Sequence, residues 1–289
     1  GECLAVSLAA RSDHAIGRHV TAALQTDQTP GDPSAPDHHV RVEQSPKWVR
    51  VVAGGHVVAD SKRVQLLRET GHTPVYYFPR EDVRMEYFEP TDRDSHCPYK
   101  GNSNYWTLKA GDKVEENAVW SYEDPYDYEG SPDIKDHIAF YWGKVDAWFE
   151  ENEQVYVHAR DPHKRIDVIP STRHVEIKID GETIADTRSP AMLFETGLPV
   201  RYYIPLLDVR MDKLTPTDRV TRCPYKGQAA YYSVTTSERE HQDVAWYYTY
   251  PTPESTGIKG SVSFFNERVD VVVDGEEQVR PRTKWSTPA

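Results

Sequence analysis

Short apolar runs broken by turn residues, with little helical periodicity, recur along the chain from about residue 40 onward. The clearest is an alternating run at 175–179 that resumes at 182–184 after Asp180-Gly181. Asp-Gly at this place predicts a type I′ hairpin, because both central residues take positive φ. Aromatic-rich runs at 75–78 and 200–204, each closed by a proline, predict further strands. Each half of the chain offers about eight such runs, which predicts an all-β fold with minor helix, built as a small antiparallel β-barrel or a rolled sandwich.

The same pattern occurs twice. Cys97-Pro98-Tyr99-Lys100-Gly101 returns as Cys223-Pro224-Tyr225-Lys226-Gly227, and nine of the twelve residues at 90–101 are unchanged at a spacing of 126. After Pro125 and Pro251 the spacing falls to 124, and a deletion tolerated there indicates a surface loop. Copies of this length are domains rather than units of a stacked array, so we expect two homologous domains in tandem. The expected segments are a largely flexible N-terminal arm (1–39), a first β-domain (40–157), a linker (158–164), a second β-domain (165–281) and a C-terminal tail (282–289).

Charge and cysteine content narrow the classes of partner. The formal net charge of −12 argues against sequence-independent nucleic-acid binding and against binding to an anionic membrane surface. No apolar run approaches the roughly 18–20 residues that span a bilayer. The three cysteines, one in each copy and Cys3 in the arm, permit no disulfide within either copy, which favours a reducing, cytoplasmic location.

A set of chemically capable side chains is present in both copies, and it defines the candidate site. Lys100 and Lys226 each precede a glycine in a turn, with Glu69 and Glu195 as candidate partners. One interpretation is a structural ion pair. The other is a pocket in which lysine and glutamate orient a small polar or aromatic molecule while aromatic rings cover its flat face. The candidate ligand-binding residues are Glu69, Tyr77, Arg84, Lys100, Tyr105 and Trp120 in the first copy, and Glu195, Tyr203, Arg210, Lys226, Tyr231 and Trp246 in the second.

The cysteines and histidines give weaker signals. Cys97 and Cys223 are candidate nucleophiles only if their thiols are activated, and His96 beside Cys97 is replaced by Arg222 in the second copy. A buried structural cysteine is therefore the favoured interpretation. We expect no metal site and no cofactor, because each copy has one cysteine and no repeated histidine. We interpret His38 and His39 as solvated residues of the arm.

Arg84 and Arg210 each follow an aspartate by two residues. This spacing favours a local ion pair with Asp82 or Asp208 over an arginine that binds an anionic ligand.

Taken together, these motifs resemble the family catalogued as domain of unknown function 427, in its tandem form. The resemblance rests on Pro-Val-Tyr-Tyr-Phe-Pro at 74–79, Asp-Val-Arg at 82–84, the Cys-Pro-Tyr-Lys-Gly turn, Ala-Val-Trp-Ser-Tyr at 118–122 and Ile-Ala-Phe-Tyr at 138–141. It implies a compact β-fold and no known activity. A nucleotidyltransferase would need a phosphate-binding glycine turn and paired carboxylates for magnesium, and the sequence shows neither convincingly.

Three hypotheses for function follow. The first is a cytoplasmic small-molecule-binding protein with one pocket in each domain. The second is a hydrolase or transferase that uses the lysine or cysteine of the repeated turn. The third is a protein-interaction module whose copies bury a shared face, for which a homodimer is the expected sign. Differences beside the shared motifs, such as Arg68 against Phe194 and Trp106 against Tyr232, mean that the two sites need not be equivalent.

Overall fold

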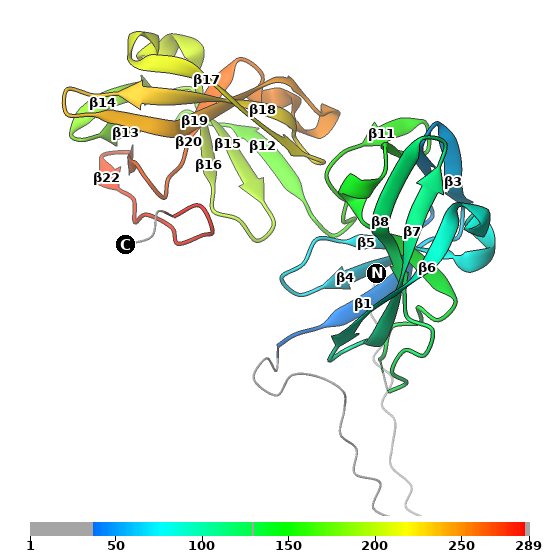
Figure 1. The fold of residues 1–289 in the computed structure, drawn as a ribbon. Coiled ribbons are helices and arrows are strands. Elements are labelled where there is room, and N and C mark those ends of the chain that lie inside the picture. Colours follow the sequence, from blue (N-terminus) through cyan, green and yellow to red (C-terminus); the bar gives the residue numbers. More distant parts are fainter. Residues whose placement is uncertain (1–36, 129, 287–289) are drawn as a thin grey trace, which may run out of the picture.

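The computed structural model describes residues 37–128 and 130–286, which form two similar β-domains (Figure 1). In the first domain a seven-stranded antiparallel sheet has the order β1-β4-β5-β9-β8-β7-β6, and a four-stranded sheet has the order β11-β10-β2-β3. We call them the large and the small sheet. The strands are β1 (Val40–Gln44), β2 (Val49–Ala53), β3 (His56–Ser61), β4 (Gln65–Glu69), β5 (Val75–Pro79), β6 (Phe88–Cys97), β7 (Gly101–Ala110), β8 (Lys113–Ser121), β9 (His137–Phe140), β10 (Ala147–Glu150) and β11 (Glu153–Val155).

The second domain repeats this topology strand for strand. Its large sheet has the order β12-β15-β16-β20-β19-β18-β17 and its small sheet the order β14-β13-β21-β22. The strands are β12 (Ile166–Pro170), β13 (Val175–Ile179), β14 (Glu182–Thr187), β15 (Ala191–Glu195), β16 (Arg201–Pro205), β17 (Leu214–Cys223), β18 (Gly227–Thr235), β19 (Glu240–Pro251), β20 (Ser261–Phe264), β21 (Asp270–Val273) and β22 (Glu276–Glu277). The predicted hairpin turn is present between β13 and β14, where Asp180 and Gly181 have φ of 49° and 78°.

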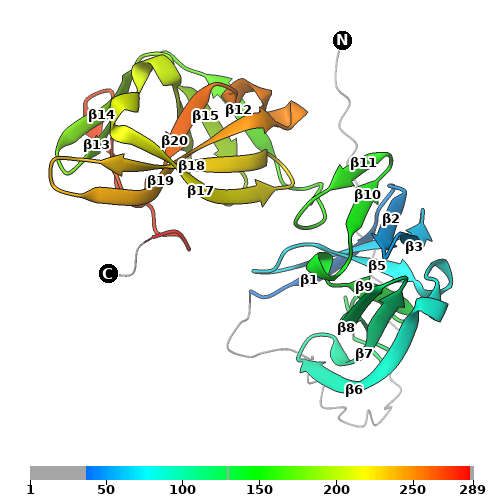
Figure 2. The ribbon, with the colours of Figure 1, turned by 45° about the horizontal axis from the view of Figure 1, so that its top comes forward.

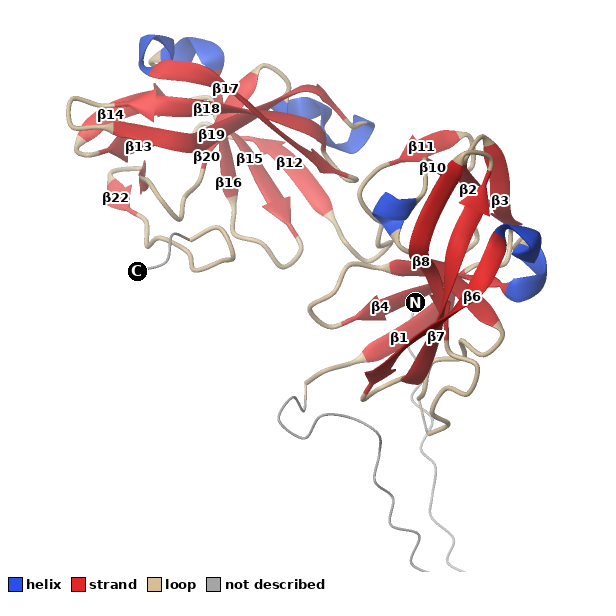
Figure 3. Cartoon of the chain, in the orientation of Figure 1, coloured by secondary structure: helices blue, strands red, loops and turns tan. Residues whose placement is uncertain are grey.

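Within residues 37–128 and 130–286, helix is confined to short 3₁₀ turns, which Figure 3 shows as isolated coils between the strands. They are η1 (Arg80–Asp82), η2 (Met85–Tyr87), η3 (Trp142–Lys144), η4 (Leu206–Asp208), η5 (Met211–Lys213) and η6 (Pro253–Ile258). None of the helices in the described residues is long and apolar enough to cross a membrane. The all-β, tandem prediction is confirmed. Of its two alternatives the rolled sandwich is correct, because each domain packs two sheets face to face and neither closes into a barrel.

Both faces of the central strands of each large sheet are buried, which explains the continuous apolar run of β5. Tyr76 and Phe78 belong to the core between the two sheets, together with Val49 and Val51 of β2. Tyr77 points to the opposite face and packs in a second cluster with Leu67, Tyr122, Ile134 and Ala139. A strand covered on both faces reads as an unbroken apolar run rather than as an alternating one. The second cluster places shared side chains on the face of the sheet that the small sheet does not cover.

The segments outside the strands only partly match the expected arm and tail. The arm predicted at 1–39 lies outside the described residues except for its last three. Within that remainder, His38 contacts the first domain. At the other end, Trp285 of the expected tail packs against the second domain. In the linker, the Asp161 backbone N–H donates a hydrogen bond of 2.6 Å to the Tyr225 hydroxyl of the second domain.

Candidate functional site

Lysine and glutamate of the shared set form a buried ion pair in each domain. Lys100, in the turn between β6 and β7, donates to the Oε2 atom of Glu69 at the end of β4. Their side chains are 8% and 12% exposed. Because β5, β9 and β8 lie between β4 and β7 in the sheet, this contact requires the sheet to roll, and Figure 2 shows the curvature of β6. The equivalent pair in the second domain joins Lys226 to Glu195.

The glycine after each lysine allows the turn to pack closely against another segment, which is the chain just after β8 in the first domain and the end of β19 in the second. Gly101 and Gly227 have φ of 96° and 100°, a region that favours glycine. A Cβ atom on Gly227 would lie 2.8 Å from the Tyr250 carbonyl oxygen, and one on Gly101 would lie 3.4 Å from the Asp124 carbonyl oxygen. The Tyr126 backbone N–H donates to the Lys100 carbonyl at 3.2 Å. The repeated pentapeptide therefore has a structural reason to be kept.

The second oxygen of each carboxylate has a different partner in the two domains, a histidine in the first and a lysine in the second. His38 Nε2 lies 3.1 Å from Glu69 Oε1, and the imidazole stacks on Tyr99 with 4.0 Å between ring centroids. In the second domain Lys164 Nζ lies 3.0 Å from Glu195 Oε1. Burial by itself would raise the pKa of both carboxyls. Lys100, helped by the hydrogen bond to His38, and Lys226, helped by Lys164, nevertheless hold the pKa of each below its ordinary value. His38, interpreted from the sequence as a solvated arm residue, is thus part of the ion-pair site.

The tyrosine and tryptophan of the shared set are hydrogen-bonded across the sheet. Trp120 Nε1–H donates to the Tyr77 hydroxyl at 3.1 Å, and Trp246 donates to Tyr203 at the same distance. Burial raises the pKa of the Tyr77 phenol, and the nearby negative charge of Glu69 adds to this effect. These residues therefore lie on one face together with the ion pair.

Tyr105 lies directly opposite Trp120 in the pairing of β7 with β8, and Tyr231 lies opposite Trp246 in the second domain. The Tyr105 hydroxyl is 2.7 Å from Ser95 Oγ. The shared glutamate, lysine, tyrosines and tryptophan are thus gathered on the same face of the large sheet.

Arg84 and Arg210 are not brought to this face. Asp82, the expected partner of Arg84, instead accepts hydrogen bonds from Ser61 Oγ at 2.6 Å and from Arg63 at 2.8 Å. The predicted Asp82–Arg84 pair is therefore replaced by a pair between Asp82 in η1 and Arg63, which follows β3.

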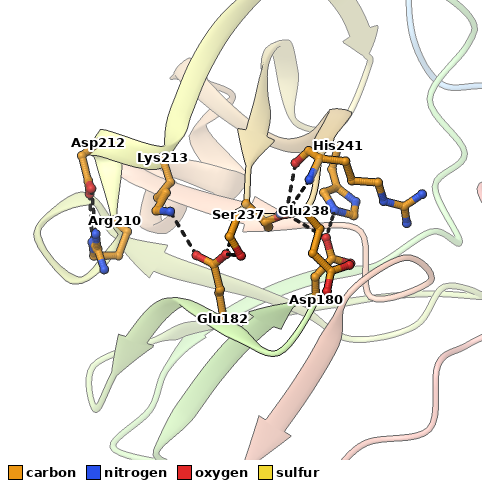
Figure 4. A network of polar contacts seen from close by, with 10 residues as sticks. Asp180, Glu182, Arg210, Asp212, Lys213, Ser237, Glu238 and His241 are labelled. Carbon is orange, nitrogen blue, oxygen red and sulfur yellow. Dashed lines mark hydrogen bonds and ion pairs between the residues drawn. The ribbon is translucent and has the colours of Figure 1, made fainter.

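Arg210 forms two hydrogen bonds with Asp212, of 2.9 and 2.7 Å, in a polar network at the β13–β14 hairpin (Figure 4). Neither arginine contacts the lysine–glutamate pair, so we remove both from the candidate site.

The two described cysteines are free thiols and are partly buried. Cys97 packs against the second cluster of the first domain. Its neighbour His96 turns toward Asn102, with 2.7 Å between His96 Nδ1 and the Asn102 Oδ1 atom. Within residues 37–128 and 130–286, no group of three or more metal-ligating side chains is present.

A groove in the surface of the first domain lies away from the ion pair. It has a volume of about 740 Å³, and its lining includes Gln44, Arg63, Gln65, Arg80, Glu81 and His137. The second domain has Leu206 and Leu207 where the first has Arg80 and Glu81. The duplication did not point to this groove, because Pro79 is the one residue of its lining that the copies share.

The two domains differ where the paired tryptophan meets the next ring. In the first domain Trp120 packs on Tyr141, with 4.6 Å between ring centroids, and Tyr141 is 37% exposed. In the second domain Trp246 packs on Phe265 at the same distance, but these rings are only 7% and 5% exposed. We call the surface formed by the exposed Tyr141, the partly buried Trp120 and the buried Tyr105 the aromatic shelf.

Three side chains of the second domain cover the rings equivalent to the shelf. The Arg201 guanidinium lies 5.5 Å from the Trp246 ring centroid and 5.6 Å from that of Trp285. Its two terminal nitrogens donate to the two carboxylate oxygens of Glu267 at 2.7 Å each. The first domain has Val75 in place of Arg201 and Gly143 in place of Glu267, so the shelf lacks this cover. The shelf could have been located from the sequence by comparing the positions at which the two copies differ.

Two tandem β-sandwiches, each with a rolled seven-stranded sheet and a buried lysine–glutamate pair, define a duplicated β-sandwich protein. The chain belongs to the family described as a domain of unknown function (DUF427), whose model matches residues 41–151 and 167–275. The resemblance inferred from the sequence motifs is thus confirmed. The comparison with curated proteins gave no match.

Proposed function

We propose that the protein binds a small planar molecule on the aromatic shelf of its first domain, and that the equivalent surface of the second domain has a structural role. The observation that carries this proposal is the difference in cover. Arg201, Glu267 and Trp285 occupy the surface over Trp246, whereas Tyr141 of the first domain is exposed. An exposed aromatic ring that neighbouring side chains hold in place is suited to stacking against a flat ligand.

The lysine–glutamate pair supports the shelf rather than forming its binding surface. Lys100 and Glu69 satisfy each other and are largely buried. The turn that carries Lys100 also closes the rolled sheet beneath Tyr77, which in turn accepts the hydrogen bond that orients Trp120. In this proposal the residues that the copies share build the surface in both domains. Residues that the copies do not share decide whether the surface is open.

Isothermal titration calorimetry with a panel of planar aromatic compounds tests the proposal. The Tyr141→Leu variant removes one exposed ring of the shelf. Tyr250→Leu is the matched control, because Tyr250 is a tyrosine of the second domain that is 82% exposed and lies outside the shelf. We expect at least a tenfold loss of affinity in the first variant and none in the second. Equal affinity of the wild type and Tyr141→Leu for every ligand would exclude the shelf as the binding site.

A further inference from the structure

We infer that the ligand of the aromatic shelf is a planar anion. This inference rests on the function proposed above and adds the sign of the ligand's charge. It comes from an arginine beside the shelf that has a carboxylate partner in the second domain and an amide in the first.

In the second domain this arginine is neutralised. The guanidinium of Arg219 stacks over the Tyr231 ring, 4.5 Å from its centroid, and lies 3.5 Å from the Asp243 carboxylate. Asp243 also accepts a hydrogen bond of 2.7 Å from Thr217 Oγ1, which fixes the carboxylate in place. The arginine of the covered surface therefore has its counter-ion within the domain.

In the first domain the stacking of the arginine on the tyrosine is kept, but the negative charge of the aspartate is absent. Arg93 stacks over the Tyr105 ring at the same 4.5 Å. Asn117 stands in the place of Asp243 and accepts the equivalent hydrogen bond from Thr91 Oγ1 at 2.8 Å. Among residues 37–128 and 130–286, no carboxylate lies within ion-pair distance of Arg93, although Asp92 and Asp94 flank it in the sequence. An arginine without a counter-ion over the shelf favours a ligand that supplies one.

The neighbouring positions also favour an anion over a cation. The cation that covers the second domain's rings, Arg201, depends on the Glu267 carboxylate. The first domain has Gly143 at that position, where a Cβ atom would meet nothing within 4 Å. Lys144 adds a second positive charge, with its Nζ atom 5.8 Å from the Tyr141 ring centroid. A cationic ligand would therefore meet two positive side chains and no carboxylate at the position of Glu267.

Calorimetric titration with three indoles of similar shape tests the sign of the charge. The probes are indole-3-propionate (anionic), indole-3-propanamide (neutral) and tryptamine (cationic). AMP and adenosine form a second anionic and neutral pair, which separates a phosphate from a carboxylate as the anionic group. We expect the anion of each pair to bind at least tenfold more tightly than its neutral counterpart, which corresponds to about 1.4 kcal/mol, and tryptamine to bind most weakly.

The matched variant is Asn117→Asp, which rebuilds the ion pair of the second domain around Arg93. Its backbone suits the change, because Asn117 and Asp243 share a φ of 50°. We expect Asn117→Asp to abolish the preference for the anion while neutral indole binding remains. Asp243→Asn is the control and should create no new site, because the second surface stays covered.

Equal binding of the anionic and neutral probes, both lost in Tyr141→Leu, would overturn this inference and leave the proposed function intact. Absence of binding by any planar probe would overturn both. An anion preference that survives in Asn117→Asp would show that Arg93 is not its source, which would also contradict the inference.

Discussion

Glu69 and Lys100 are joined by an ion pair although three strands of the same sheet separate the elements that carry them. The two side chains lie 31 residues apart in the sequence. The contact ties the end of β4 to the turn between β6 and β7, and it exists only in the rolled form of the sheet. The second domain repeats it with Glu195 and Lys226, also 31 residues apart. The strongest repeated motif of the sequence is thus part of a closure that the fold needs twice.

Removal of Lys100 alone should destabilise the first domain. The Lys100→Met variant leaves the Glu69 carboxylate buried without its lysine partner, and breaking a buried pair from one side costs about 3 kcal/mol. Hydrogen exchange at the amides of β5 and β7 measures the local free energy of unfolding.

The double variant Glu69→Leu with Lys100→Met is the control, because it removes both charges and should recover most of the loss. Lys226→Met should cost less, because Lys164 remains beside Glu195, whereas Lys100 is the one lysine paired with Glu69 among the described residues. A double variant as unstable as Lys100→Met would contradict this account of the pair.

The glycine after Lys226 should tolerate a side chain less well than the glycine after Lys100. Gly101→Ala should cost about 1 kcal/mol for its positive φ. Gly227→Ala should cost more, because its Cβ atom would also lie 2.8 Å from the Tyr250 carbonyl oxygen. Gly197→Ala separates the two effects, since Gly197 has a φ of 75° and open space around it. Chemical denaturation of the three variants gives the order, and equal losses for Gly197→Ala and Gly227→Ala would rule out the close contact.

Glu182 should contribute to stability in a pH-dependent way. The side chain and backbone N–H of Ser237, with help from Lys213, lower the pKa of this carboxyl from an ordinary 4.5 to about 2 (Figure 4). A carboxyl with a lowered pKa in the folded state stabilises that state above its unfolded pKa and loses this contribution as the pH falls. Wild type should therefore exceed Glu182→Gln in stability at pH 6, and the difference should shrink as the pH falls from about 4.5 to 2.

The first domain lacks this carboxylate, because it has His56 at the position of Glu182. It therefore serves as an internal control for the pH dependence. Melting temperatures measured across the acid range check the prediction. A difference between wild type and Glu182→Gln that stays constant from pH 6 to pH 2 would show that the carboxylate is not the cause.

Trp285 should be required for the cover of the second domain. Trp285→Ala removes a ring that packs on the Arg201 guanidinium and should destabilise this domain by about 2 kcal/mol, less than a fully buried tryptophan would. Acrylamide quenching of fluorescence should also rise, because Trp246 becomes accessible. Trp285→Phe keeps a ring at this position and should retain most of the protection. Unchanged quenching in Trp285→Ala would mean that Arg201 and Glu267 cover Trp246 without the C-terminal segment.

Local pattern was sufficient to predict the all-β class, the hairpin at Asp180 and the duplication, although the roughly eight runs expected in each half fall short of the eleven strands of each domain. The order of the strands was not predictable, because pairings such as β5 with β9 join segments about sixty residues apart through non-local contacts. The pairing of Lys100 with Glu69 could be suggested because both residues repeat. The contacts of Glu182 could not, since Lys213 and Ser237, 31 and 55 residues away, reach it only in the folded domain.

The candidate site shows the limit of the duplication as a signal. Shared residues such as Tyr77 and Lys100 turned out to be mostly buried, and they explain how the sheet is held. The exposed surface depends on residues that the copies do not share, among them Asn117 and Gly143. A difference between the copies can be interpreted only when the structure shows which side chain becomes exposed because of it.

The most direct test of the central claim is a titration followed by the indole N–H signals of the seven tryptophans in a ¹⁵N-labelled sample. Indole-3-propionate is the ligand, and the signals of Trp120 and Trp246 are assigned with Trp→Phe variants. The account predicts a saturable shift of the Trp120 signal, with the Trp246 signal unchanged, and loss of the shift in Tyr141→Leu. Equal shifts of Trp120 and Trp246, or a shift confined to Trp246, would contradict it.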